Sequence, residues 1–318
     1  MSDLTEAITR LDQLDESLYL GRICWYAITN TSHIEHNAFC QELLRHFNSA
    51  ALPPVPRSSD VFKRACTAAQ KKNVPTTESD KLMNILIREV GKDANNIWRH
   101  VVVETVDTSG HALDYSECVS IHYDRQAQSI NVKPICDSAG TPHLASEDPA
   151  VLAVVQEVRD LYAHWFNMLT PYAVREHIRR LVRNMGATIL RDGVYFVPQE
   201  HADKVEALEK IVEFVGGGSM FHSLPLVDDR KQRKMLRAAF EEDSVGQIDA
   251  MLAEIGNIFR NDRKISSATF ADYKVAYDGL RGKIANYSDL LDEAMETTAS
   301  RLEVMDRALF DLMGRVKS

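Results

Sequence analysis

The chain lacks three features that would place it in a membrane or outside the cytoplasm. No apolar run approaches the roughly 20 residues that a helix needs to cross a bilayer. Residues 1–20 contain no basic segment followed by an apolar one, so no secretory signal is predicted. The five cysteines are odd in number and form no Cys-x-x-Cys pair, which argues against a disulfide framework. We therefore expect a cytoplasmic protein with no membrane contact.

The chain also has fewer basic residues than acidic ones. The 318 residues include 46 acidic and 37 basic side chains, for a formal net charge of −9. This balance argues against a large non-specific surface for nucleic acid, although it leaves a local basic patch open. Apolar residues make up 45% of the chain, which is enough for two or three domains with their own cores.

The pattern of apolar residues predicts an α+β fold that is mainly helical. We expect a domain boundary near residues 137–149, where strand-like alternation ends in a segment with Ser, Gly and Pro and a helix follows. Three parts are predicted: an N-terminal α+β domain at 1–140, a central helical domain with a β-hairpin at 149–228, and a C-terminal helical hairpin or coiled coil at 229–318.

The N-terminal part combines both kinds of secondary structure. Residues 1–14 are expected to form a short helical lead, and the aromatic and branched residues of 18–29 predict a buried strand. A helix is expected at 79–90, with Gly91 at its end. Between 97 and 135 three runs rich in branched residues predict a small antiparallel meander.

The strongest single signal is an apolar seam near the C-terminus. Its members recur at steps of three and four, with one extra step of four after Thr298, and such a seam needs a partner surface. We define the seam as Phe270, Tyr273, Tyr277, Leu280, Ile284, Tyr287, Leu291, Ala294, Thr298, Leu302, Met305, Leu309 and Leu312.

The seam predicts one helix over residues 267–315, about 70 Å long at 1.5 Å per residue, folded against a shorter helix at 229–260. Gly279 and Gly282 lie inside the long helix and indicate a bend or the close approach of another backbone. Two interpretations stay open. The seam is covered either by the chain's own helices and domains or by a second copy in a homo-oligomer.

A second pattern is a helix with one cationic face. Arg175, Arg179 and Arg183 repeat at steps of four, and the following hairpin carries Arg191. Helix, helix and hairpin in this order are typical of a winged-helix unit, in which a basic helix enters the major groove and the wing contacts phosphates. The alternative is an ordinary solvated face whose arginines pair with acidic residues of the same chain.

Other candidate sites are weaker. His33, His36 and Cys40 share one predicted helix face and are residue types that bind zinc, but a fourth ligand is missing. The segment 216–219, Gly-Gly-Gly-Ser, follows a helix and lacks the Lys-Ser/Thr pair of a P-loop. We therefore predict no catalytic residue, no metal and no cofactor.

Two segments carry a resemblance. GATILRDGVYFVP at 186–198 and FHSLPLVD at 221–228, followed by long helices, resemble a family of uncharacterised proteins of tailed phages and related mobile elements. The WYA strand at 25–27, the PPVP loop at 53–56 and WRH at 98–100 fit the same resemblance. It implies a setting in a phage or plasmid within a bacterial host cell, and no activity.

Three hypotheses follow. The first is a non-enzymatic accessory protein that binds itself or another protein through its C-terminal helices. The second is a nucleic-acid-binding protein that contacts phosphates through the basic helix and the wing. The third is an enzyme whose site no motif reveals, because catalytic residues can come together from distant segments.

Overall fold

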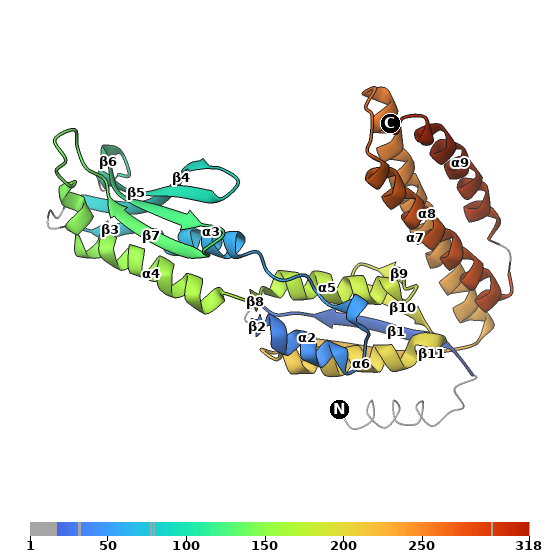
Figure 1. Ribbon diagram of the computed structural model, residues 1–318. Coiled ribbons are helices and arrows are strands. Elements are labelled where there is room, and N and C mark those ends of the chain that lie inside the picture. The colour runs from blue at the N-terminus through green and yellow to red at the C-terminus, as the bar shows by residue number, and fades with distance from the viewer. Residues whose placement is uncertain are drawn as a thin grey trace, which may run out of the picture. The chain divides into compact units, whose positions relative to one another are not determined.

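The computed structural model describes residues 18–30, 33–76, 78, 80–107, 109–293 and 295–317 (Figure 1). It contains both helices and antiparallel sheets, which confirms the predicted mixture of α and β structure. In the described part of the chain, no helix is long and apolar enough to cross a membrane. The helical lead predicted at 1–14 and the seam residue Ala294 lie outside the described residues.

The chain divides into two compact units. Unit 1 consists of Met1–Ser32, Glu42–Ala51 and Pro171–Ser318, and unit 2 consists of His33–Gln41 and Leu52–Thr170. The boundary predicted near 137–149 falls inside unit 2, because the helix that follows it packs on the sheet that precedes it. The predicted parts 149–228 and 229–318 likewise share unit 1 for most of their length.

Unit 1 is built around a four-stranded antiparallel sheet with the order β11-β1-β10-β9. Along the chain its elements follow the order strand, helix, strand, strand, helix, strand, and all of unit 2 is inserted between the first strand and the first helix. This βαββαβ arrangement is the one called ferredoxin-like. Its elements are β1 (Tyr19–Ala27), α5 (Pro171–Asn184), β9 (Thr188–Arg191), β10 (Val194–Pro198), α6 (Ala202–Val215) and β11 (Met220–Val227).

The helices α5 and α6 lie on the same face of this sheet. The ring of Tyr26 stacks between Tyr195 and Phe221 on that face, and its hydroxyl donates to the carbonyl oxygen of Arg175 in α5. On the same face, the hydroxyl of Ser223 donates to a carboxylate oxygen of Glu209 in α6. Successive side chains along a strand point to opposite faces of the sheet, so the residues that alternate with these project from the other face.

The hairpin predicted to follow the basic helix and to carry Arg191 is present as β9 and β10. It is not an isolated wing, because β10 pairs with β1 from Gly21 to Trp25 and the hairpin forms half of the sheet. The predicted winged-helix arrangement is therefore wrong for these elements. The pairing depends on Gly21, where a Cβ would overlap the carbonyl oxygen of Val197 and lie 2.8 Å from the ring of Phe196.

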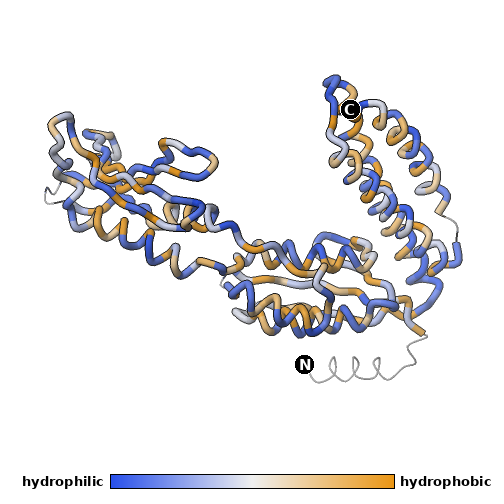
Figure 2. Tube along the Cα trace, viewed as in Figure 1, coloured by the Kyte–Doolittle hydropathy of each residue, from blue (hydrophilic) through white to orange (hydrophobic). Residues whose placement is uncertain are grey.

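The C-terminal part of unit 1 is a bundle of three helices, α7 (Arg230–Arg260), α8 (Ser267–Leu291) and α9 (Glu296–Met313). The single long helix predicted at 267–315 is wrong, because Asp292 adopts a left-handed conformation that ends α8. A bridge between Ile265 and Val316 places the end of α9 beside the start of α8, so α9 runs back along α8. Figure 2 shows apolar residues interspersed with polar ones along all three helices.

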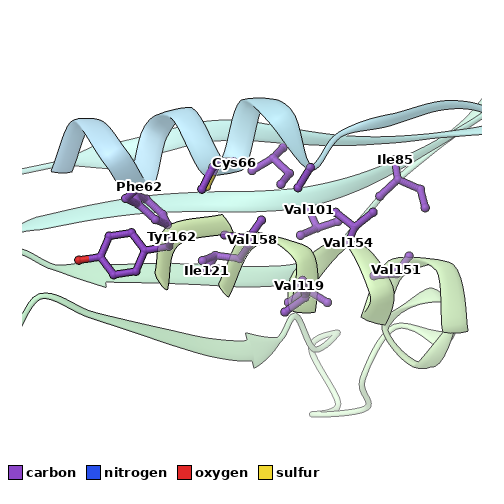
Figure 3. Packing of buried hydrophobic residues seen from close by; sticks show 14 of the residues in the cluster. Phe62, Cys66, Ile85, Val101, Val119, Ile121, Val151, Val154, Val158 and Tyr162 are labelled. Atoms are coloured by element: carbon purple, nitrogen blue, oxygen red, sulfur yellow. The ribbon is translucent and has the colours of Figure 1, made fainter. Parts of the chain in front are cut away.

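Unit 2 contains a five-stranded antiparallel meander in sequence order. Its strands are β3 (Lys71–Pro75), β4 (Lys81–Lys92), β5 (Asn96–Asp107), β6 (Ala112–Asp124) and β7 (Ser129–Pro134). The helices α3 (Ser58–Ala68) and α4 (Pro149–Trp165) pack side by side on one face, with Phe62, Val154 and Val158 against Val101 and Ile121 (Figure 3). The helix predicted at 79–90 is wrong, because this segment is β4 and pairs with β5 along its whole length.

Short elements complete the chain. The strands β2 (Ile34–Glu35) and β8 (Met168–Leu169) pair with each other, so the chain enters and leaves unit 2 at neighbouring points. The remaining helices are α2 (His36–Leu44) and the short 3-10 turns η2 (Ser49–Ala51), η3 (Leu144–Glu147) and η4 (Gln199–His201).

Candidate functional site

The candidate site of unit 1 is a cavity of about 520 Å³. Its wall comes from the end of α5, the β9–β10 hairpin, the η4 turn and the facing sides of α7 and α8. Its lining includes the apolar residues Ala187, Ile189 and Leu280 together with charged and amide groups. Concave sites with an apolar wall and a few converging polar groups are the usual form of small-molecule sites.

The floor of the cavity holds a buried ion pair. Nζ of Lys283 in α8 lies 3.1 Å from Oδ2 of Asp243 in α7, and the two side chains are only 13% and 8% exposed. The ammonium group also lies 5.6 Å from the ring centre of Phe240 and 5.8 Å from that of Tyr287. Burial lowers the pKa of Lys283, which the Asp243 carboxylate partly opposes. The ammonium group is thus held at the floor by one carboxylate and two rings.

A second cation faces this pair. Arg183, in the last turn of α5, lines the cavity and contributes to the lowered pKa of Lys283, so its guanidinium group acts on the ammonium group. Among the described residues Arg183 forms no ion pair with a carboxylate. The cavity therefore combines the buried Lys283–Asp243 pair with a second, exposed cation.

Two further acids and three amides complete the polar part of the lining. Glu200 and Asp278 line the cavity, and the Glu200 carboxylate lies beside the ring of His201. Burial lowers the pKa of the His201 imidazole, which favours its neutral form. The amide side chains of Asn184, Gln247 and Asn286 supply both hydrogen-bond donors and acceptors.

Two glycines in α8 help to keep the cavity open. Gly279 and Gly282 line it, and a Cβ built on either one would meet no other atom within 4 Å. Among the described residues, no other backbone approaches these two glycines closely, so that one of the two explanations offered for them is wrong here. A helical glycine costs about 1 kcal/mol relative to alanine, and here no packing contact explains that cost. The space in front of them is instead part of the cavity.

The arginines predicted to contact nucleic acid lie in several different environments. Arg175 donates to the carbonyl oxygen of Ile28 at 2.6 Å, and Arg179 forms an ion pair with Glu176. Arg183 faces the cavity, and Arg191 is exposed at the end of β9. Arg180, beside them, donates to Nδ1 of the buried His177 at 2.9 Å.

The seam lies largely inside the three-helix bundle of a single chain. Tyr277, Leu280, Ile284, Tyr287, Leu291, Thr298, Met305, Leu309 and Leu312 are buried, and Phe270, Tyr273 and Leu302 are partly buried against the same core. Tyr287 also fixes the bundle to the sheet, because its hydroxyl donates to the carbonyl oxygen of Gly186 at 3.0 Å and its ring meets Phe196 edge-on.

The weak zinc candidate is only partly assembled. Sγ of Cys40 lies 3.6 Å from Nε2 of His36, and that nitrogen is also 3.1 Å from the carbonyl oxygen of Pro53. Within the described ranges, no three His, Cys, Asp or Glu side chains gather in a way that could hold a metal ion.

Sequence reasoning found the helices of the site but not its charged pair. Lys283 stands directly before the seam residue Ile284, where a cation next to a buried stripe could have drawn attention. Its partner Asp243 belongs to a different helix, and nothing local in the sequence connects the two.

Comparison with known proteins gives one match. A family described as "Family of unknown function (DUF6744)" matches residues 19–318, which include both units and the cavity. No curated protein and no solved structure matches the chain.

Proposed function

The chain belongs to this DUF6744 family of unknown function, and we propose that unit 1 binds a small molecule with an anionic group in the cavity between α5, the hairpin, α7 and α8. The observation that carries the proposal is that Lys283 and Arg183 line the same cavity, while among the described residues Asp243 is the one carboxylate that forms an ion pair with either of them.

The electrostatics favour an anion at this floor. Lys283 and Arg183 act on each other as like charges, and the single carboxylate of Asp243 is already bonded to Lys283. A phosphate or carboxylate placed between the two cations would relieve this repulsion. Charge-assisted hydrogen bonds of this kind are roughly twice as strong as neutral ones.

The remaining wall limits the size and polarity of the rest of the ligand. A volume of about 520 Å³ suits a small metabolite, and Ala187, Ile189 and Leu280 offer an apolar surface to its uncharged part. The acids Glu200 and Asp278 line other parts of the same cavity, so a ligand that also carries an amino group would find partners for it.

Calorimetric titration with inorganic phosphate, at constant ionic strength set with chloride, tests the anion site. If phosphate binds with a Kd near about 1 mM, then 10 mM phosphate should raise the free energy of unfolding by about 1.4 kcal/mol. Arg183→Ala should abolish this gain, because it removes one of the two cations that line the cavity, and it should leave the core intact because Arg183 is exposed. Absence of any phosphate effect, or an equal effect in Arg183→Ala, would reject the anion site.

A second test fills the part of the cavity that lies in front of Gly279 and Gly282. Gly282→Ala should raise the stability of the free protein by up to about 1 kcal/mol, because the helix gains propensity and the methyl group meets nothing. It should also weaken phosphate binding, since the methyl group occupies the cavity. Gly246→Ala in α7 is the matched control, because its Cβ also meets nothing and it does not line the cavity. It should stabilise the protein without affecting binding.

Self-association through the C-terminal helices is the second candidate function. It is supported by large apolar side chains on the outside of the bundle, where Val275 and Phe310 are 72% and 73% exposed and Met313 is 55% exposed. Light scattering should then show a dimer or larger species that Phe310→Ser converts to a monomer. A monomer at high micromolar concentration would remove this candidate.

A further inference from the structure

The sheet of unit 2 has one face that neither α3 nor α4 covers. The two helices pack on Ile85, Val101, Ile121 and their neighbours, so the residues between these project from the other side. The pairing register sets which residues are neighbours on that second face, which we call the outer face of unit 2.

Two adjacent rows cross the outer face. In the first row, Arg88 of β4 stands opposite His100 of β5, His100 opposite Ser120 of β6, and Ser120 opposite Lys133 of β7. In the second row, Trp98 of β5 stands opposite His122 of β6. Since neighbouring strands are about 4.8 Å apart, the first row spans roughly 14 Å. A basic row thus runs beside an aromatic pair.

The aromatic pair is held in a fixed position. The rings of Trp98 and His122 are stacked, with centres 5.5 Å apart and planes 19° apart. Nε2 of His122 lies 2.8 Å from Oδ1 of Asn96, which fixes the imidazole ring. Both side chains are only partly buried, so they still present ring surface to solvent.

The cations at the ends of the basic row are exposed. Within the described ranges, neither Arg88 nor Lys133 forms an ion pair with a carboxylate, whereas His100 between them contacts Glu117 at 2.9 Å. Beside Arg88 the face is hollowed by a space of about 660 Å³, which Lys72, Asn84 and the carboxylate of Glu104 also line. The free positive charge of the row therefore lies at its two ends.

We infer that the outer face of unit 2 binds single-stranded nucleic acid, with bases stacked on Trp98 and His122 and phosphates bound by Arg88 and Lys133. Proteins that bind single strands combine aromatic side chains with cations that follow the backbone. A duplex is disfavoured, because its bases are already stacked on each other and cannot cover these rings. This inference is independent of the cavity in unit 1, and none of its residues belongs to the basic helix.

The test measures fluorescence anisotropy of a labelled 20-nucleotide single strand with the full chain, over a series of salt concentrations. Binding should be modest because the chain is acidic, and log affinity should fall by about 0.7 per log unit of salt for each phosphate neutralised. Arg88→Gln with Lys133→Gln should weaken binding and reduce this slope by about 1.4. Trp98→Ala should weaken binding by about tenfold and leave the slope unchanged.

Matched controls separate this face from the rest of the chain. Lys63→Gln with Arg159→Gln removes the same charge from α3 and α4 on the covered side and should leave binding unchanged. Trp98→Phe keeps an aromatic ring and should retain most of the affinity, which distinguishes lost stacking from a folding defect. No binding at micromolar protein and low salt would overturn the inference. Equal losses in the two charge variants, or tighter binding of the matching duplex, would do the same.

Discussion

Replacing Asp243 by Asn should strongly destabilise unit 1, because it leaves the ammonium group of Lys283 without its carboxylate. The Lys283 side chain is 13% exposed and contacts the rings of Phe240 and Tyr287. An amide can accept a hydrogen bond from the ammonium group but cannot neutralise its charge. Arg183 adds to the cost, since it acts on Lys283 as a second positive charge.

The magnitude follows from the geometry of the pair. Breaking a buried ion pair by removing one partner costs about 3–5 kcal/mol, whereas replacing both partners by apolar residues is often neutral. The cavity opens beside Lys283, so the lysine chain can move its ammonium group towards water in the variant. We therefore expect the lower end, about 3 kcal/mol, for Asp243→Asn, and a similar loss for Lys283→Met.

Urea denaturation of Asp243→Leu, of Lys283→Met and of the double variant Asp243→Leu/Lys283→Met measures the coupling. The double variant should recover most of the stability that each single variant loses, because no unpaired charge is left behind. The reasoning would be refuted if each single variant lost less than about 1 kcal/mol, or if the two losses simply added in the double variant.

Three further predictions concern other parts of the chain. Gly21→Ala should cost about 3 kcal/mol or more in urea denaturation, because its Cβ would overlap the carbonyl oxygen of Val197, and an unchanged midpoint would contradict the close pairing of β1 and β10. Burial and the Asp306 carboxylate raise the pKa of Tyr277 from 10.0 to about 12. An unfolded tyrosine loses its proton first, so stability should be intact below pH 10 and fall between pH 10 and 12, and Tyr277→Phe should make this fall shallower in thermal melts. Burial raises the pKa of Cys24 and Cys66 to about 12, so at pH 8 a thiol reagent should label the exposed Cys136 at once and these two cysteines only after unfolding.

The sequence correctly predicted those helices and hairpins whose formation depends mainly on residues that are neighbours along the chain. The helix expected before residues 216–219 and the hairpin expected to carry Arg191 are both present, because a helix that ends in glycines and a two-residue turn are specified by neighbouring residues. The sheet that joins β1 to β10 and β11 was missed. Its strands are separated by the whole of unit 2, and no pattern in one segment reveals that distant pairing.

Two errors have a common physical cause. Lys81–Lys92 carries apolar residues in its centre and charges at its end, which also suits a short helix, and only the pairing with β5 makes it a strand. The seam continues in nearly constant phase past Leu291, so its periodicity conceals the break at Asp292. In both cases tertiary contacts decide between local structures that the sequence permits equally well. The Lys283–Asp243 pair could not be predicted for the same reason, because its two residues meet only when α7 and α8 pack against each other.

The insertion of unit 2 into unit 1 makes the two proposed sites separable by experiment. The cavity is lined by residues of unit 1 alone, and the outer face is built from unit 2 alone. Substitutions that share no partner usually have additive effects, within about 0.3–0.5 kcal/mol. The double variant Trp98→Ala/Arg183→Ala should therefore bind the oligonucleotide about tenfold more weakly, as Trp98→Ala does, and should lose phosphate binding, as Arg183→Ala does. If Arg183→Ala alone weakened oligonucleotide binding as much as Trp98→Ala, nucleic acid would be bound through the arginine helix of unit 1 instead, as the arginine spacing first suggested. If phosphate at 10 mM weakened oligonucleotide binding more than chloride of equal ionic strength, the two sites would be coupled, and their independence would be refuted.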